Sequence, residues 1–418
     1  MGQQIFKGNI IFTPSPEELK ICAKSHIVVE DGTVEGIYER LPEKYGHAPV
    51  KDYGERLILP GFVDLHVHAA QFYQCGLGLD RELIDWLSDC TFPAESRFSD
   101  PVYAREAYSL FADELIRQGT ARACIFATIH KESTGLLFEI LQEKGIGAFV
   151  GKVNMDRNCP GFLREETEVS IEETEELIIQ YGGHPLVKPI LTPRFAPSCS
   201  GKLLAAIGEL AEKYNLPVQS HLAENRREVE WVRELFPSRP TYSDVYFDSG
   251  LFGQTPTLMA HGIYLTDREL GLIKDNGVVL VHCPESNINL ASGIMPVRKW
   301  LGRGIRAGLG SDVGAGHTLA MSKAVVRAIQ LSKLMKFFDP WAKPLTIAEA
   351  FYMATKGGGS FFGKVGSFEK GYSFDAIVVE DDPRIAGRLS LEEQFQRFLY
   401  TGDDRNIIAR FVRGRQVG

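Results

Sequence analysis

One apolar segment ends abruptly in two histidines: Leu57-Ile-Leu-Pro-Gly-Phe-Val-Asp-Leu-His-Val-His68. Side chains two positions apart on a strand point to the same side. His66 and His68 are therefore predicted to leave the end of a buried strand aimed at one point. Imidazole is a preferred ligand of zinc and related transition metals, so the pair is a candidate for half of a metal site. The alternative is two strand histidines with ordinary hydrogen bonds, and the rest of the chain argues against it.

The composition is that of a soluble globular protein with a large core. The chain has 418 residues, of which 44% are apolar and 24% charged, and its net charge is -8. This mild acidity gives no electrostatic reason to expect nucleic acid or an anionic membrane as a partner. No apolar run approaches the roughly 20 residues that span a bilayer. The first residues, Met-Gly-Gln-Gln-Ile-Phe-Lys-Gly-Asn, lack a basic start followed by an apolar signal core.

The cysteine pattern points to a reducing compartment. Seven cysteines are dispersed along the chain, and none forms a Cys-x-x-Cys pair. An odd, scattered set favours neither a disulfide framework nor a thiolate zinc site. We therefore expect a cytoplasmic protein.

Two short β-rich segments flank a long middle part. Turn signals, Asp31-Gly32 near the start and Arg413-Gly414-Arg415 near the end, separate alternating apolar runs. Neither segment alone offers enough apolar surface for a core, so residues 1–60 and 366–418 are predicted to form one small β-sandwich-like domain together. The strands expected in it are Ile5–Ile11, His26–Glu30, Val34–Tyr38, Phe374–Glu380 and Ile407–Val412.

Residues 61–365 alternate between strand-like and helix-like patterns. Eight such repeats over about 300 residues predict an α/β fold, a (β/α)8 TIM barrel, whose catalytic residues lie at the carboxyl ends of the strands. Helices are expected around Tyr103–Gln118, from a capping box at Ser170-Ile-Glu-Glu173, and after Ser200. The eight strands expected are Gly61–Leu65, Thr120–Ala127, Ala148–Val153, Leu186–Leu191, Leu216–Ser220, Thr257–Ala260, Val278–Val281 and Arg306–Gly310.

Unexpected polar residues follow these strands. His221 comes after the fifth strand with Glu224 three residues later, His261 after the sixth, and Asp312 after the eighth. A buried ionised carboxylate is costly unless it is paired or binds a metal. Together with the first two histidines, four of the ten histidines in the chain stand at strand ends. We therefore predict that they and Asp312 surround one metal ion.

Three imidazoles and one carboxylate would leave a coordination position open for water, as in catalytic sites. A metal there would lower the pKa of its water toward ~7 and supply hydroxide at neutral pH. Glu224 stands close enough to His221 to act as general acid and base. It could also be a carboxylate favoured by a helix N-terminus, and both roles are compatible.

At this point the chain resembles a known family. Pro-Gly-Phe-Val-Asp-x-His-x-His, His-x-x-Glu, Ala-His-Gly, His-Cys-Pro-x-Ser-Asn and Gly-x-Gly-Ser-Asp together resemble the amidohydrolase superfamily, in its mononuclear deaminase branch, almost from end to end. Within that branch, three segments resemble the guanine deaminases. They are His68-Ala-Ala-Gln71-Phe, Trp86-Leu with Thr91-Phe-Pro-Ala-Glu95 and Arg97-Phe98, and Leu191-Thr-Pro-Arg194-Phe195-Ala-Pro-Ser.

The resemblance implies a role for each matching residue. His66, His68, His221 and Asp312 would hold one zinc ion, with iron as the alternative, and His261 would complete the shell or hydrogen-bond the water. Glu224, His261 and Asp312 would be catalytic. The residues implied to contact the substrate are Gln71, Trp86, Arg194, Phe195, Glu224 and Asp312.

The implied reaction is a hydrolysis of the C–N bond of a cyclic amidine. Hydroxide would attack guanine C2, Glu224 would pass a proton to N3, and ammonia would leave xanthine, an activity of purine catabolism. An arginine fork suits the base carbonyl, and aromatic faces stack on the ring at ~1–3 kcal/mol per base. Arg194 could instead form a structural salt bridge, and Trp86 and Phe195 could be plain core. The resemblance also implies a homodimer.

Several alternatives stay open. Other deaminases and chlorohydrolases, acting on 8-oxoguanine, pterin, cytosine or triazine substrates, share the metal ligands. An inactive structural relative is disfavoured because no expected ligand is missing. The fourth strand ends in Thr192-Pro-Arg194, which argues against a bridging carbamate on Lys188. The cytidine-type zinc deaminases are excluded, because their His-x-Glu and Pro-Cys-x-x-Cys motifs are absent. His282, Asn287 and His317 receive no assigned role.

Overall fold

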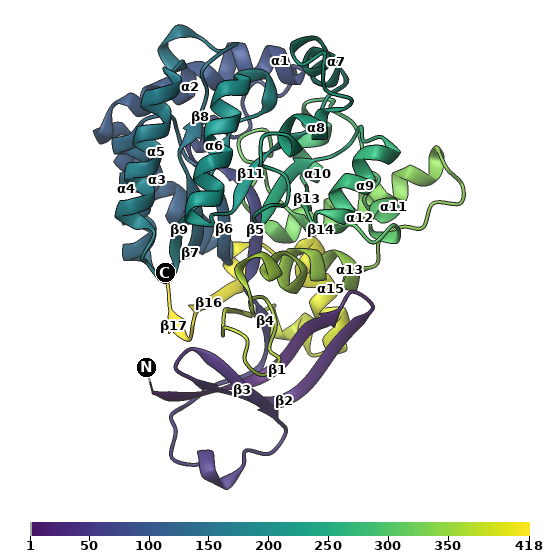
Figure 1. The fold of residues 1–418 in the computed structure, drawn as a ribbon. Coiled ribbons are helices and arrows are strands. Elements are labelled where there is room, and N and C mark those ends of the chain that lie inside the picture. Colours follow the sequence, from purple (N-terminus) through teal and green to yellow (C-terminus); the bar gives the residue numbers. More distant parts are fainter. Residues whose placement is uncertain (1) are drawn as a thin grey trace.

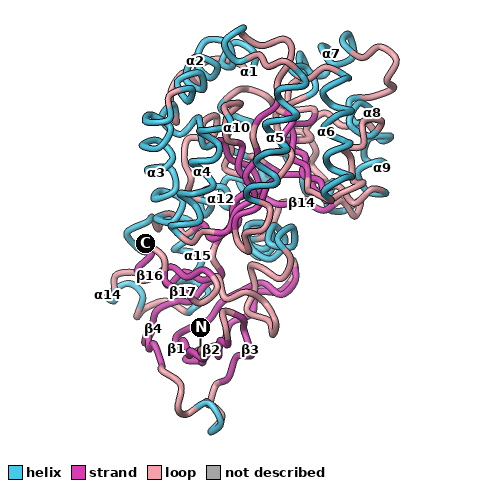
Figure 2. The backbone as a smooth tube through the Cα atoms, turned by 60° about the vertical axis from the view of Figure 1, so that its left-hand side comes forward, coloured by secondary structure: helices cyan, strands magenta, loops and turns pink. Residues whose placement is uncertain are grey.

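The computed structural model describes residues 2–418 and has two parts (Figure 1). A ring of strands surrounded by helices forms the upper part, and a sheet that contains both ends of the chain forms the lower part. Figure 2 shows the same division from another side. The strands are β1 Gln3–Ser15, β2 Glu18–Glu30, β3 Thr33–Tyr38, β4 Val50–Pro60, β5 Phe62–His68, β6 Thr120–Phe126, β7 Gly147–Gly151, β8 Val153–Asn154, β9 Val187–Pro189, β10 Thr192–Pro193, β11 Val218–Leu222, β12 Thr257–His261, β13 Val279–His282, β14 Arg306–Leu309, β15 Ala376–Val379, β16 Ile407–Val412 and β17 Arg415–Gln416.

The terminal sheet has seven strands in the order β17-β16-β15-β4-β1-β2-β3. Asp31 and Gly32 join β2 to β3 with φ of 47° and 81°, and Arg413 and Gly414 join β16 to β17 with φ of 49° and 76°. Both hairpins therefore have the positive φ at two consecutive residues that a tight turn between twisted strands needs. The union of both termini in one sheet confirms the sequence prediction, and β4 and the two-residue β17 are the strands that the pattern missed.

The upper part is a (β/α)8 barrel. Strands β5-β6-β7-β9 and β11-β12-β13-β14 form two parallel four-stranded sheets, and a parallel bridge from Leu191 to Val218 connects them. β8 and β10 pair with each other beyond the ends of β7 and β9. All residues of β5 and β6 are buried, as expected for strands enclosed on both faces. All eight predicted barrel strands are present, with ends shifted by up to three residues.

Backbone hydrogen bonds close the ring between β14 and β5. The Asp312 N–H donates to the His66 carbonyl at 2.8 Å, and the His68 N–H donates to the Val313 carbonyl at 2.9 Å. Gly310 permits this approach, because a Cβ at that position would lie 2.8 Å from the Cβ of His66. The segment that closes the barrel therefore also carries Asp312 to the first two histidines.

The helices cover the outside of the barrel (Figure 2). Ser200 caps α6 by accepting from the Leu203 N–H, as predicted. The predicted capping box at Ser170 is wrong: α5 begins three residues earlier, and the Ser170 hydroxyl donates to Glu165 at 3.0 Å instead. The helices are α1 Leu83–Trp86, α2 Phe92–Ser96, α3 Pro101–Arg117, α4 Lys131–Lys144, α5 Thr167–Tyr181, α6 Gly201–Tyr214, α7 Arg226–Leu235, α8 Tyr242–Phe247, α9 Asp267–Asp275, α10 Pro284–Asn289, α11 Val297–Gly302, α12 Met321–Leu334, α13 Ile347–Tyr352, α14 Pro383–Ala386 and α15 Leu391–Thr401. None of the described helices is both long and apolar enough to cross a bilayer.

A buried ion pair connects the two parts of the fold. Arg122 on β6 donates through Nε to Asp375 Oδ2 at 2.7 Å, and their side chains are 6% and 0% exposed. The other carboxylate oxygen, Oδ1, accepts from the Arg413 N–H and the Ser373 hydroxyl. Asp375 therefore holds a barrel strand against the C-terminal strands. The domain boundaries at residues 60 and 365 remain a prediction.

Removing this carboxylate should destabilise the protein strongly. Asp375→Ala leaves the Arg122 guanidinium buried without its partner, which costs about 3–5 kcal/mol. Asp52→Ala is the matched control, because Asp52 pairs with Lys7 on the surface and such pairs contribute less than about 1 kcal/mol. Denaturant unfolding of both variants measures the difference. Equal losses would show that the buried pair does not hold the two parts together.

Candidate active site

A pocket opens at the end of the barrel away from the terminal sheet. α1 and α7 lie over this end at the top of Figure 1, and α1 contributes to the pocket wall. The predicted ligands His68, His221 and Asp312 reach the pocket floor. The lining residues are His68, Gln71, Leu83, Trp86, Leu87, Arg194, Phe195, His221, Glu224, Leu290, Asp312 and Ala315.

Three histidine nitrogens and one carboxylate converge beneath this pocket. His68 Nε2 lies 3.3 Å from the Nε2 atoms of both His66 and His221. Asp312 Oδ1 lies 3.2 Å from His66 Nε2 and 3.4 Å from His68 Nε2. The four donor atoms lie within 4.8 Å of one another, which is the size of a coordination sphere. The predicted ligands therefore do come together from β5, β11 and the segment after β14.

The imidazoles turn their Nε2 atoms toward one another. His221 Nδ1 lies 2.6 Å from the Arg194 carbonyl and donates to it, which leaves Nε2 as an unprotonated acceptor. Burial lowers the pKa of His68 to about 4 and the pKa of His221 well below its ordinary value, so both rings favour the neutral form that binds a metal. The backbone carbonyl that orients His221 is the support that metal-ligating histidines usually have.

Asp312 supplies the negative charge of this cluster. Burial raises the pKa of its carboxyl group, but His66 and the neighbouring imidazoles outweigh burial and bring the pKa well below its ordinary value. One carboxylate among neutral nitrogens is a donor set that suits zinc and iron. Asp312 also has a φ of 50°, in the left-handed region that aspartate tolerates better than most non-glycine residues.

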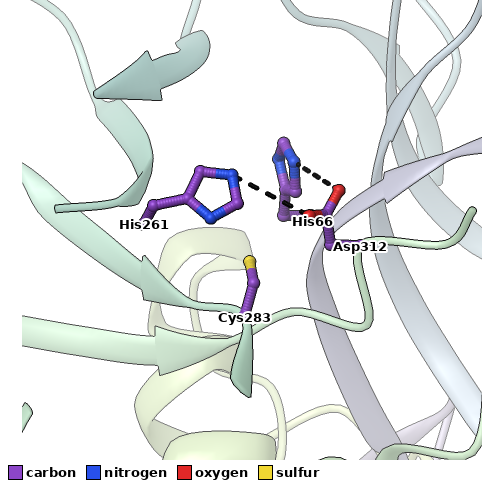
Figure 3. A group of neighbouring side chains, drawn as sticks. All are labelled: His66, His261, Cys283 and Asp312. Atoms are coloured by element: carbon purple, nitrogen blue, oxygen red, sulfur yellow. Dashed lines mark ion pairs between the residues drawn. The ribbon is translucent and has the colours of Figure 1, made fainter. Parts of the chain in front are cut away.

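His261 points toward Asp312 from the opposite side of the site, as Figure 3 shows. Its Nδ1 lies 2.8 Å from Asn287 Oδ1 and donates to it, so Nε2 is the ring nitrogen that faces the site. That nitrogen is buried without a hydrogen-bond partner among the described residues, 3.5 Å from Glu224 Oε2 and 3.8 Å from Asp312 Oδ2. A ring nitrogen that faces two carboxyl groups calls for a proton, a water molecule or a cation between them. His261 therefore fits either role predicted for it.

Cys283 forms a second possible donor set with His66, His261 and Asp312 (Figure 3). Burial raises the pKa of this thiol well above its ordinary value, which favours the protonated form. The thiol also donates to the Val281 carbonyl at 3.7 Å. The set of three histidines and one aspartate has His68, His221 and Asp312 on the pocket wall, whereas of the set with Cys283 only Asp312 lines the pocket, so the first set fits a metal that must meet a substrate.

Glu224 precedes α7 and faces the cluster. The Ser292 hydroxyl donates to Glu224 Oε1 at 2.9 Å, while Oε2 is the oxygen nearest His261. Burial and then the Asp312 charge raise the pKa of Glu224 to about 8. Its backbone N–H donates to Glu228 Oε2 at 2.8 Å, and Tyr242 donates to the other oxygen of Glu228. Both the carboxylate and the backbone of Glu224 are therefore fixed.

The residues predicted to contact a base form the pocket wall. Trp86 is 2% and Phe195 is 5% exposed, and the indole Nε1 of Trp86 donates to the Leu77 carbonyl. Gln71 and Arg194 face the same space. Arg194 also makes a buried ion pair with Glu95 at 2.5 Å, so it is both a pocket residue and a salt-bridge partner.

Sequence reasoning missed several supporting residues. Ser292, Glu95 and Asn287 each bond a site residue, and Asn287, which had no assigned role, accepts from His261. His282 is buried with both ring nitrogens unpartnered among the described residues, and His317 bonds Asn289 at the surface. Glu95 and Asn287 had a signal in the sequence, since each stands in a segment already identified by resemblance, whereas Ser292 had none.

Comparison with known proteins fits this geometry. Residues 57–417 match the amidohydrolase family. The chain belongs to this family. It is 38% identical to a guanine deaminase of Dictyostelium discoideum over 99% of this chain and 98% of the relative, and 41% identical to the Homo sapiens guanine deaminase over 86% and 82%. It also belongs to the guanine deaminases within the family.

A solved structure resembles the whole chain. The crystal structure of guanine deaminase from C. acetobutylicum, with guanine bound in its active site, superimposes with a TM-score of 0.99 at 49% identity and covers 100% of both chains. The binuclear alternative within this amidohydrolase fold gains no support, because the Lys188 side chain on β9 is exposed to solvent.

Removal of one predicted ligand should abolish metal binding. His68→Ala takes away the nitrogen at the centre of the cluster, and we expect less than about a tenth of the wild-type metal content, because losing a ligand of a four-donor site removes much of its affinity. Elemental analysis of purified protein gives the content. The control is His47→Ala, since His47 is exposed. Full metal content in His68→Ala would contradict the assignment of this cluster.

Proposed function

We propose that this chain catalyses the hydrolytic deamination of guanine to xanthine and ammonia. The observation that carries the proposal is that one pocket joins a metal-type donor cluster to an arginine, a glutamine and two aromatic side chains. The names of the relatives and the guanine-bound neighbour support the choice of substrate. Water and guanine are the only reactants that the proposal needs.

We propose that His66, His68, His221 and Asp312 hold one divalent ion, with zinc favoured over iron. The donor set fits both, and the unpaired His261 nitrogen fits a water or a fifth ligand position. When bound, such an ion supplies a nucleophile at neutral pH by lowering the pKa of water. His261 and Asp312 face the same point and would orient that water.

The base would lie flat between apolar walls. Trp86 and Phe195 would cover the purine ring, while Leu290 and Ala315 exclude water. Arg194 would donate to the base carbonyl through its guanidinium fork. Gln71 would donate from the same wall. With these contacts, C2 would point toward the floor of the pocket, where Glu224 and Asp312 lie.

Glu224 would move the protons. It takes a proton from the attacking water and delivers it to ring N3 as C2 becomes tetrahedral. Glu224 would then carry the second proton from the C2 hydroxyl to the exocyclic amino group, so that the C–N bond breaks, ammonia leaves and the C2 carbonyl of xanthine forms. Ser292 holds Oε1, so Oε2, which lies closest to His261, is the oxygen placed for this transfer.

Guanine turnover, with metal analysis on the same sample, tests the proposal. We expect stoichiometric xanthine and ammonia from guanine, with slower or no release from 8-oxoguanine, pterin, cytosine and triazine substrates. In the same assay, Glu224→Gln should keep its metal and lose about 10²–10⁴-fold in kcat, the usual contribution of a general acid–base group. Glu230→Gln, on the exposed face of α7, is the control. Preferential release from another substrate would replace guanine, and an active Glu224→Gln would remove Glu224 from the mechanism.

We also propose a cytoplasmic homodimer. All seven cysteines are free, which suits a reducing compartment. Phe337, Phe338 and Trp341 are 83%, 76% and 90% exposed, and aromatic side chains gathered on a surface in this way mark interfaces. We expect sedimentation of the wild type at twice the chain mass and of Trp341→Ser nearer to one. A monomeric wild type would contradict the proposal.

A further inference from the structure

A buried carboxylate joins the two polar residues of the base pocket. Glu95 lies on the short helix α2, and its side chain is 4% exposed. Its Oε1 accepts from Gln71 Nε2 at 2.8 Å, and its Oε2 accepts from Arg194 Nη1 at 2.5 Å. Gln71 and Arg194 both line the pocket, whereas Glu95 does not. One carboxylate therefore connects the two groups that face the base.

We propose that Glu95 is a positioning residue that makes the pocket specific for a purine with a carbonyl oxygen on the edge bound by Gln71 and Arg194. The inference rests on the proposed function for its substrate class. Glu95 acts through these two side chains, because it has no place on the pocket surface itself.

Glu95 determines which way the Gln71 amide faces. A glutamine amide can turn over and exchange its donor and acceptor ends. Here Nε2 is committed to the carboxylate, and Oε1 accepts from the Gly314 N–H at 3.2 Å. Both contacts agree on one orientation, in which the second N–H of the amide is available as a donor. The opposite orientation would set an oxygen against the carboxylate.

Glu95 also keeps Arg194 away from the catalytic carboxylates. Arg194 shares the pocket with Glu224 and Asp312, either of which would attract a guanidinium lacking a partner of its own. The pair with Glu95 satisfies Nη1, and the guanidinium lies 5.3 Å from the centre of the Phe92 ring on the same helix. These contacts hold the fork at the wall, where its remaining N–H groups can meet a base.

The consequence is a pocket edge that offers donors only. A carbonyl oxygen and a ring nitrogen without hydrogen accept from such an edge, whereas an amino group would meet donors and lose its own hydrogen bonds. Unpaired polar groups in a buried site carry a large penalty, which makes this kind of site selective. Without the carboxylate, the amide can turn and the discrimination weakens.

Binding of two inert purines separates specificity from catalysis. Hypoxanthine carries the carbonyl oxygen and purine lacks it, and neither has the amino group that the reaction removes. We expect the metal-loaded wild type to bind hypoxanthine more tightly than purine in calorimetric titrations. In Glu95→Gln, the hypoxanthine Kd should rise roughly ten- to a hundredfold, as for loss of a charge-assisted hydrogen-bond network, while the purine Kd changes by less than about threefold.

Guanine kinetics provide the second readout. The KM of Glu95→Gln should rise by about the same factor as the hypoxanthine Kd, with kcat much less affected, because the lost contacts bind ground state and transition state alike. Glu234→Gln, an exposed glutamate of α7, is the matched control. If Glu95→Gln does not fold, Glu95→Asp keeps the charge but withdraws it by one methylene, and the same preference for hypoxanthine should shrink.

The outcomes are distinct. An unchanged preference for hypoxanthine over purine in a folded Glu95 variant would overturn the inference. So would an equal loss of both ligands, because that result describes a collapsed pocket and not a turned amide. A wild type that binds hypoxanthine selectively but does not release ammonia from guanine would refute the proposed function and leave the role of Glu95 standing.

Discussion

The convergence of three imidazole nitrogens is the constraint on which the rest of the site depends. The Nε2 atom of His68 lies 3.3 Å from the Nε2 atoms of both His66 and His221, at the floor of the pocket. Lone pairs on these nitrogens would bind a cation at their centre. The fold must therefore hold side chains from distant parts of the chain together at this point. Metal binding would then add to the stability of the folded state, because the unfolded chain has no such site.

The residues that close the barrel also hold the metal-site side chains in place. Asp64 on β5 accepts from the Ser311 N–H at 3.0 Å and from the His66 N–H at 3.2 Å, and the Ser311 hydroxyl binds its other oxygen. Burial raises the pKa of Asp64 to about 6, although these donors oppose the shift. The first and last strands of the barrel are thus connected beside the ligands they carry. A loss of closure would separate His66 from Asp312 directly.

Most of the fold and the metal-ligand set could be predicted from two features of the sequence. These are the alternation of side chains along each strand and the polar residues that follow the strand ends. His66 and His68 needed only the alternation of one strand, and parallel strands bring their carboxyl ends to the same edge. Prediction failed where long-range contacts decide. Ser170 has the local pattern of a helix cap, but Glu165 and Asn154 bind its hydroxyl in the interior. Glu95 meets Arg194 across 99 residues of chain, and no local period indicates which cation a buried carboxylate will meet.

Three buried carboxylates around one pocket can do different work because each has different partners. Asp312 faces imidazoles that keep its carboxylate ionised, so it can bind a cation. Glu224 is buried, with one serine hydroxyl and the Asp312 carboxylate nearby. Burial and this second carboxylate favour the protonated form of Glu224, which suits a group that must carry a proton. Glu95 pairs with the Arg194 guanidinium and the Gln71 amide, so its negative charge positions these two side chains and takes no part in the reaction. The identity of the neighbours, more than the carboxyl group itself, assigns the role of each. If the neighbours of two of these carboxylates were exchanged, the two carboxylates would exchange their roles as well.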